Sequence, residues 1–226
     1  MLAIDTCCEK FSYETLSFLK KTMQCSASVF TWFDHVSDVP THFSDGLDEH
    51  IIDHYYDQYV ENDPISHIQL IHQHAITARL TPALLEQEHT EKYQDFMQRY
   101  QFKDEVDIIL WAAGAPVASI ALLKMKDDSP FQSHFDLEQI RQFIQFNFEL
   151  LPTIKKLNLR SQLKQQFNLT AKESLTAELL CQGYANKEIA LQLCIEPATV
   201  KTHLINIFNK LEVNSRTQAV ARISNI

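Results

Sequence analysis

The spacing of apolar residues changes its period along this chain of 226 residues, and that change limits the possible folds more than any other feature. Up to about residue 160, segments with helical three- and four-residue spacing alternate with runs rich in β-branched and aromatic residues, which are typical of strands. From residue 169 onward only the helical spacing remains. Since this length allows two domains that each bury a core, we expect an α+β domain over residues 1–160, a polar linker over 161–168 and an all-α domain over 169–226.

The first part carries signals for both helices and strands. Helical spacing predicts helices over residues 9–24, 48–60, 86–101 and 137–159. Pro152 is expected to end or kink the last of these, and Thr81-Pro82 has the composition of a helix start. Strand-like runs cover residues 28–33, 105–111 and 116–124, and the break before the third contains Gly114, which is typical of a β-hairpin. This order predicts a small, mostly antiparallel sheet covered by helices.

Charge divides the chain at the same place. The net charge of the whole is -9, but residues 169–226 hold six Lys and Arg against five Glu, a net of +1. The acidic excess therefore lies in the first part, and the last part is compatible with a nucleic-acid partner.

Several functional classes are excluded by composition. The three glycines, Gly46, Gly114 and Gly183, lie far apart, so neither a Walker A loop nor a GxGxxG turn is present. Five cysteines without a CxxC pair predict free thiols in a reducing compartment. With neither a signal peptide nor an apolar segment long enough to cross a membrane, the expected location is the cytoplasm.

No catalytic residue, cofactor or metal site is expected. Among the clustered histidines only His50 and His54 have a spacing that brings two imidazoles together on a helix, and no HExxH motif accompanies them. Solvated helix faces are the favoured explanation of these histidines. The chain also lacks GxSxG and any recognisable Cys-His arrangement, so we do not expect an enzyme.

The last part has the order of a helix-turn-helix domain. Thr170 and Glu173 form a capping box at the start of a helix that is expected to end near Gly183. A short helix over residues 187–193, a break and a longer helix over 198–211 follow. Ser215 is the expected cap of a fourth helix over 217–223.

Five sequence blocks in this part closely resemble the LuxR-type DNA-binding domain. They are LTAKE (169–173), GYANKEIA (183–190), TVKTH (199–203), IFNKL (207–211) and VNSRT (213–217). The resemblance covers about a quarter of the chain. It implies a four-helix domain whose third helix enters the major groove of double-stranded DNA and whose fourth helix forms a two-fold contact, so a homodimer is expected.

The third predicted helix has one apolar and one polar face. Val200, Leu204 and Ile207 fall on the apolar face, whereas Lys201 and Thr202 fall on the other. Lysine and threonine side chains in a major groove contact base edges, and residues at helix ends contact phosphates. The residues expected to contact DNA are Asn186, Lys187, Thr199, Lys201, Thr202, Ile205, Lys210 and Arg216.

Two positions depart from the family pattern. Cys194 stands where the family usually has glycine, and Glu196 stands where a serine usually caps the third helix. Glutamate is a weaker cap, although its charge suits a helix N-terminus. Both changes are expected to weaken DNA binding or to make it depend on dimerisation.

The element order of the first part resembles the autoinducer-binding domain of quorum-sensing regulators and its PAS/GAF-like relatives. Asp63-Pro64 resembles the Asp-Pro of that domain, whose carboxylate accepts a hydrogen bond from the ligand amide. The aromatic positions of acyl-homoserine-lactone receptors are not matched, with Ala78 near the place of one tryptophan. The fold is therefore expected to be shared, and the ligand is left unidentified.

The candidate ligand-binding residues are Tyr55, Tyr56, Tyr59, Asp63, Trp32 and Trp111. The aspartate and the tryptophans each have an alternative role. Asp63 is equally suited to bind backbone amides in a turn, and for the large tryptophans a place in the core is the favoured interpretation.

Taken together, the sequence predicts a dimeric, sequence-specific transcriptional regulator whose DNA binding is modulated by a small molecule in the first domain. The alternatives are a regulator that needs no effector and one that a partner protein controls, with a first domain that mainly dimerises. A phosphorylated receiver domain is rejected, because the single Asp-Asp pair, Asp127-Asp128, follows the predicted hairpin instead of the first strand.

Overall fold

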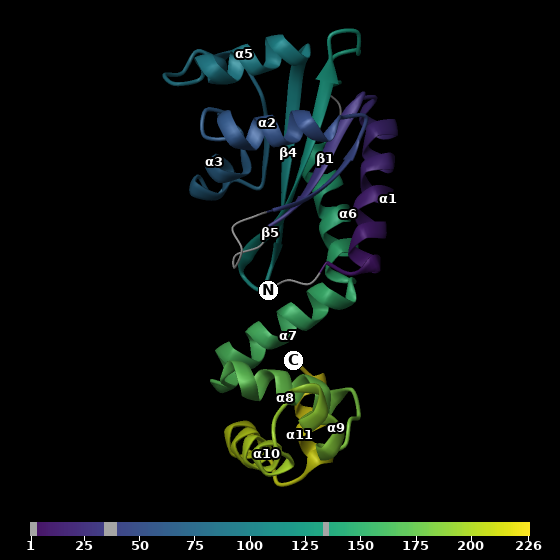
Figure 1. Ribbon diagram of the computed structural model, residues 1–226, viewed down its shortest axis with the longest axis vertical. Coiled ribbons are helices and arrows are strands. Elements are labelled where there is room, and N and C mark those ends of the chain that lie inside the picture. Colours follow the sequence, from purple (N-terminus) through teal and green to yellow (C-terminus); the bar gives the residue numbers. More distant parts are fainter. Residues whose placement is uncertain (1–3, 34–39, 133–135) are drawn as a thin grey trace. The chain divides into compact units, whose positions relative to one another are not determined.

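The computed structural model describes residues 4–33, 40–132 and 136–226 (Figure 1). The chain divides into two compact units, residues 1–153 (unit 1) and residues 154–226 (unit 2). No helix in the described residues is long and apolar enough to cross a membrane.

A five-stranded antiparallel sheet forms the centre of unit 1, with the strand order β2-β1-β5-β4-β3. Its strands are β1 (Ala27–Trp32), β2 (Thr41–Asp45), β3 (Thr77–Arg79), β4 (Phe102–Ala112) and β5 (Ala115–Met125). The predicted hairpin is confirmed as β4 and β5. Its two turn residues, Ala113 and Gly114, have φ values of 55° and 77°, as a two-residue hairpin turn of type I′ requires.

Helices cover both faces of this sheet (Figure 1). One face carries α1 (Thr6–Met23) and α6 (Leu137–Glu149), and the other carries α2 (Glu49–Gln58), α3 (His67–His72) and α5 (Glu91–Tyr100), with the single-turn α4 (Pro82–Leu85) preceding α5. All six residues of β1 are buried, because a strand that is covered on both sides buries both sets of alternating side chains. The predicted α+β class is confirmed.

The alternation along β1 separates two interiors. Phe30 and Trp32 pack against the α1 and α6 side, where Trp32 stacks on Phe148 with ring centroids 5.3 Å apart. Val29 and Thr31 point to the opposite side, toward α2, and line a cavity there. The two sides of the sheet therefore have different roles, one as packed core and one as the wall of a pocket.

Unit 2 is entirely helical. It holds most of α7 (Pro152–Phe167), followed by α8 (Ala171–Cys181), α9 (Asn186–Gln192), α10 (Pro197–Leu211) and α11 (Arg216–Ser224). Its core joins Leu163 of α7 to Leu180, Ile189, Val200 and Ile207 of the following helices. The predicted capping box is present, because Thr170 Oγ1 accepts from Glu173 N and a Glu173 carboxylate oxygen accepts from Thr170 N.

The helical segment expected over residues 137–159 is two helices, because the chain breaks before Pro152 as predicted, and the ring and missing N–H of Pro152 fit the first turn of α7. Other predicted boundaries need correction. The linker expected over residues 161–168 is helical as far as Phe167, because Leu163 is fully buried in the unit 2 core. The strands β2 and β3 and the short helix α3 were not predicted.

Candidate functional site

The exposed face of α10 presents the residues that sequence reasoning assigned to DNA. Thr199, Lys201 and Thr202 are exposed, and Ile205 keeps 55% of its surface accessible. Val200, Leu204, Ile207 and Leu211 occupy the other face and are buried in the unit 2 core. The helix is therefore held by one face and offers its other face to a groove.

The start of α10 is held weakly. Glu196 occupies the N-cap position without a side-chain hydrogen bond to the helix, and Pro197 follows at the first helical position. Cys194, in the turn before it, has a φ of 52°, the left-handed region that favours glycine. The glycine and serine that the family usually has at these two positions fit this geometry better than the residues present.

Two of the expected phosphate contacts are engaged inside unit 2. Lys210 Nζ lies 2.6 Å from Glu173 Oε2 and donates to Asn168 O at 3.0 Å. Arg216 donates to the carbonyl oxygens of Leu180 and Tyr184 at 3.2 and 2.7 Å. These cations hold the helices together in the structure, so their predicted DNA contacts remain predictions.

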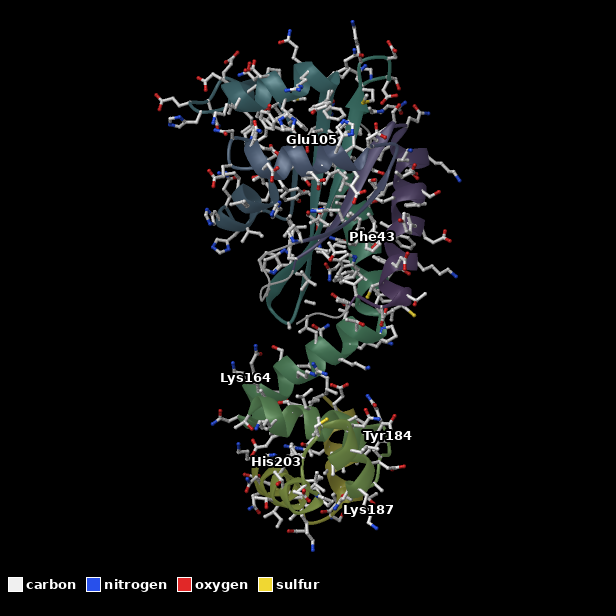
Figure 2. All side chains as sticks on the ribbon, viewed as in Figure 1. Phe43, Glu105, Lys164, Tyr184, Lys187 and His203 are labelled. Atoms are coloured by element: carbon white, nitrogen blue, oxygen red, sulfur yellow. The ribbon has the colours of Figure 1, made fainter. Side chains whose placement is uncertain are left out.

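Two further predicted contacts lie at the start of α9. Asn186 is half-buried, and Lys187 is exposed and projects from the surface of unit 2 (Figure 2). Among the described residues, Lys187 and Lys201 are thus the members of the predicted set whose charge has no partner within the chain.

The difference in net charge is larger between the two structural units than between the two sequence segments defined above. Unit 2 contains ten Lys and Arg against five Glu, a net charge of +5, because α7 contributes four cations. Two of these, Lys156 and Arg160, lie near the buried Glu178, with Arg160 Nη2 at 2.6 Å from Glu178 Oε2. The positive charge of unit 2 suits a polyanionic partner.

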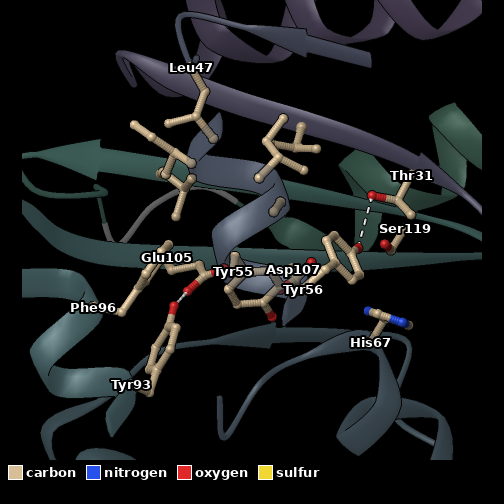
Figure 3. Close-up of a pocket in the computed structure, with 15 residues that line it drawn as sticks. Thr31, Leu47, Tyr55, Tyr56, His67, Tyr93, Phe96, Glu105, Asp107 and Ser119 are labelled. Atoms are coloured by element: carbon tan, nitrogen blue, oxygen red, sulfur yellow. Dashed lines mark hydrogen bonds between the residues drawn. The ribbon is translucent and has the colours of Figure 1, made fainter. Parts of the chain in front are cut away.

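A second candidate site is a cavity of about 50 Å³ between α2 and the sheet of unit 1 (Figure 3). Its wall is largely apolar and aromatic, with Tyr55 and Tyr56 from α2 and Phe96 from α5. The carboxyl groups of Glu105 and Asp107 enter it from β4, where two residues at i and i+2 face the same side. None of the described residues of the wall is a lysine or an arginine.

Asp63 lies beside this cavity and is fully buried. Its carboxylate accepts from Tyr55 OH at 2.6 Å and from the backbone N–H of Ile65 at 2.9 Å, so the turn contact that was the alternative interpretation is present. Oxygen atoms of Asp63, Glu105 and Asp107 all lie within 4.8 Å of one another. Three acidic groups are therefore gathered at one end of a mostly apolar cavity.

Burial changes the protonation of these groups. Loss of hydration raises the pKa of Asp63 to about 6, and it raises the pKa values of Glu105 and Asp107 well above the ordinary range, with the negative charge of Asp63 adding to both. Burial has the opposite effect on His42 and His67, whose pKa values fall to about 4. The histidines near the cavity are thus neutral at pH 7 and do not balance the carboxylates.

The remaining predicted ligand residues lie elsewhere. Trp32 is 1% exposed on the other side of the sheet and donates to Ser12 Oγ at 2.9 Å, which agrees with the core interpretation. Tyr59 packs on Phe96 outside the cavity wall, and Trp111, near the end of β4, is not part of the wall either. Of the predicted set, the structure brings together Tyr55, Tyr56 and Asp63.

Glu105 and Asp107 were missed by sequence reasoning. The run from residue 105 to 111 was interpreted by its apolar content as a strand, and its two acidic residues were not interpreted. The available signal was their spacing, because carboxylates at i and i+2 within a buried strand share one face.

Comparison with known proteins gives matches in both units. Residues 167–223 match the family described as "Bacterial regulatory proteins, luxR family". The monoamine regulon transcriptional regulator of Klebsiella aerogenes is 36% identical over 180 residues, which cover 76% of this chain and 74% of that protein. Since unit 2 has only 73 residues, this match extends well into unit 1.

Two other matches support less, one because it covers a short segment and the other because its sequence identity is low. The response regulator protein VraR of Staphylococcus saprophyticus is 44% identical over 68 residues, covering 28% of this chain and 32% of that protein. The crystal structure of Escherichia coli SdiA aligns with a TM-score of 0.51 at 14% identity and covers 97% of this chain and 94% of that one, which supports the fold. The relatives carry the names of regulators, in agreement with the expectation that the chain is not an enzyme.

Proposed function

Because this chain belongs to the luxR family of bacterial regulatory proteins, and is thus a transcriptional regulator with a DNA-binding helix-turn-helix domain, we propose that a small molecule held in unit 1 controls its binding to DNA. The observation that carries this proposal is the cavity beside α2, into which buried carboxyl groups project. A first domain that served only to dimerise would have no reason to bury acidic groups beside a cavity.

On the DNA side, we propose that α10 lies in the major groove. Lys201, Thr202 and Ile205 would contact base edges, because their side chains are exposed on the face opposite the unit 2 core. Asn186, Lys187 and Thr199 would contact phosphates at the rim of the groove, together with Lys210 and Arg216 if their internal contacts are exchanged.

A homodimer is part of the proposal. One helix-turn-helix domain reaches few base pairs, and two domains related by a two-fold axis would read two half-sites of a palindrome. We propose that the regulated genes form a monoamine regulon, as the name of the relative from Klebsiella aerogenes states for that protein.

The DNA-binding part is tested by selection from a randomised duplex library with the full-length protein at one stated salt concentration. Lys201→Ala should weaken binding to the selected site by about 1–3 kcal/mol and relax one base position. The matched control is Lys126→Ala, an exposed lysine of unit 1. Equal losses for the two variants, or selection of a site without two-fold symmetry, would contradict the proposal.

The effector part is tested by measuring the affinity of the full chain for the selected site with a panel of amines, carboxylic acids, alcohols and lactones. Ala121→Leu is the matched variant, since Ala121 lines the cavity and a larger side chain there fills it. We expect at least one class to change the affinity of the wild type and to leave that of Ala121→Leu unchanged. If no compound acts, or if the variant responds equally, one of the effector-independent alternatives applies.

A further inference from the structure

We infer that the cavity of unit 1 binds a small primary monoamine, with its ammonium group against Asp107 and Glu105 and its apolar body along α2 and the neighbouring strands. This inference rests on the proposed function, because it names the chemical class of the effector for the same cavity. It is argued from the partners of the buried polar groups, from the charges that face them and from the rest of the wall.

The buried polar groups at the cavity are unequally satisfied. Asp63 is held by Tyr55 and by a backbone amide, and Glu105 accepts a hydrogen bond from the hydroxyl of Tyr93. Asp107, which is 4% exposed, receives no hydrogen bond in the described part of the chain from any donor outside the three carboxyl groups. A buried carboxylate normally has donors around it, so Asp107 is left facing the cavity with unused acceptor capacity.

Ser119 provides a second polar group of this kind. It is 5% exposed, lies on β5 in the cavity wall, and its hydroxyl has no hydrogen-bond partner among the described residues. Figure 3 places its oxygen at the same end of the cavity as Thr31 and His67. A ligand that donates several hydrogen bonds from one atom, as a primary ammonium does, matches a wall that offers both carboxyl and hydroxyl oxygen atoms as acceptors.

No lysine or arginine among the described residues of the cavity wall balances this end. The buried lysine of β5, Lys124, donates to the backbone oxygens of Met23 and Gln24 and lies on the other side of the sheet from Ser119 and Asp107. The nearby His42 and His67 are neutral, because burial lowers their pKa values to about 4. A positively charged ligand beside the carboxyl groups would therefore meet no competing lysine or arginine among the residues of the cavity wall.

The apolar side chains in the rest of the cavity wall favour an amine with a single charged group. Leu47, Ile51, Leu123 and Ala121 make the other end of the cavity apolar, which excludes a second charged group. Polyamines and amino acids are therefore poor ligands, the former for their second ammonium and the latter for their carboxylate. The rings of Tyr55 and Tyr56 add faces that attract an ammonium ion.

Cavity size sets the scale of the ligand. A volume of about 50 Å³ holds the equivalent of roughly three to five water molecules, so the space takes an ammonium group and a short apolar body. A divalent cation is the competing occupant, but two of the three carboxyl groups already accept hydrogen bonds from tyrosines, which leaves few free oxygen ligands.

The test is titration of the full-length protein at pH 7.5 with butylamine, 2-phenylethylamine, 1-butanol, 2-phenylethanol, putrescine and CaCl₂. Heat is measured by calorimetry, and unfolding of unit 1 is followed by tryptophan fluorescence. We expect a monoamine to bind at least tenfold more tightly than its alcohol and than putrescine. Asp107→Asn should lose at least tenfold in affinity, whereas the exposed Asp127→Asn should keep it.

Other outcomes overturn the inference. Equal binding of amines and alcohols would show that the carboxyl groups do not receive the ligand, and stabilisation by Ca²⁺ alone would make the cluster a metal site. Ala121→Leu should abolish binding by filling the cavity while all carboxyl groups stay in place. This second variant keeps the inference testable if Asp107→Asn fails to fold. If another compound class changes DNA affinity and amines do not, the inference fails and the proposed function stands. If no class acts, both fail.

Discussion

Replacing Asp107 by asparagine removes one of three carboxyl groups that unit 1 buries beside its cavity, at nearly constant volume. Burial raises the pKa values of Asp107 and Glu105 well above the ordinary range, so between the unfolded and the folded pKa values the folded unit keeps protons that the unfolded chain has released. The free energy of unfolding therefore falls as the pH rises. Each such carboxyl group contributes a slope of about -1.4 kcal/mol per pH unit, and the two together about -2.7.

The pH window follows from the neighbouring groups. His42 and His67 have pKa values of about 4 when folded against 6.5 in the unfolded chain, so they add stability as the pH rises through that range. Asp63 has the opposite effect, because its pKa rises from 3.8 in the unfolded chain to about 6 in the folded unit, so the free energy of unfolding falls as the pH rises through that range. The buried tyrosines and cysteines, whose pKa values are raised, titrate at higher pH. Above pH 6.5, the raised pKa values of Glu105 and Asp107 are therefore the cause that we expect for a fall in stability with rising pH.

The protein carries its own probe for this measurement. Its two tryptophans, Trp32 and Trp111, both lie in unit 1, so fluorescence during urea unfolding of the full chain reports that unit alone. We expect the free energy of unfolding of the wild type to fall between pH 7 and 8, by at most about 2.7 kcal/mol, and that of Asp107→Asn to fall less steeply. Asp127→Asn should behave as the wild type. A wild-type stability that is flat or rises over this range would refute the assignment of protonated carboxyl groups to the cavity.

Three further substitutions test the local structure of unit 2 by circular dichroism. Cys194→Gly should raise its stability by about 1 kcal/mol, because glycine adopts a φ of 52° without strain; a lower melting temperature would contradict this. Glu196→Ser should add about 0.5–2 kcal/mol by giving α10 a side-chain cap that it lacks, and an unchanged melting temperature would count against that role. Thr170→Ala should cost about 1 kcal/mol through loss of the capping box, and a cost near zero would show that Glu173 and Lys210 hold this end without it.

Unit 2 could be predicted closely because its signals are local. Helix caps and the spacing of apolar residues act within a few residues, and the predicted starts and ends of α8 to α11 agree with the structure to within one or two positions. Helix α7 is the exception. Its last turns are polar and resemble a linker, and only the burial of Leu163 against other helices makes them part of the domain.

The sheet of unit 1 was predicted at its centre and missed at its edges. Strands β4, β5 and β1 are covered on both faces and have continuous apolar runs. Strands β2 and β3 are the two edge strands; β2, with the sequence THFSD, has a single large apolar residue, and β3 has three residues in all. Their pairing is set by neighbours distant in sequence, so little in their own composition signals it.

In the candidate site, too, the residues with a local sequence signal were predicted and the others were missed. Asp63 was found from the dipeptide Asp63-Pro64, which is a local pattern. Its proximity to Glu105 and Asp107 depends on how the turn after α2 packs against β4, some forty residues later in the chain. Tyr93 and Ser119 are likewise brought to the site by packing, so spacing along the chain does not reveal them.

The burial of carboxyl groups beside the cavity lowers the stability of unit 1 and also makes this site suitable for control. Oxygen atoms of the three carboxyl groups lie within 4.8 Å of one another, and each proton that Glu105 or Asp107 holds above its ordinary pKa marks stability that the unit loses as the pH rises. An ammonium ion at Asp107 would displace such a proton and turn repulsion into attraction. Binding then stabilises the arrangement of α2 against β4 most strongly at the pH where the empty unit is weakest, since a ligand that binds only the folded form adds its binding free energy to the fold. A neutral ligand in a purely apolar cavity would give no such dependence on pH. The carboxyl groups that lower the stability of the unit would thus be the groups through which ligand binding changes that stability.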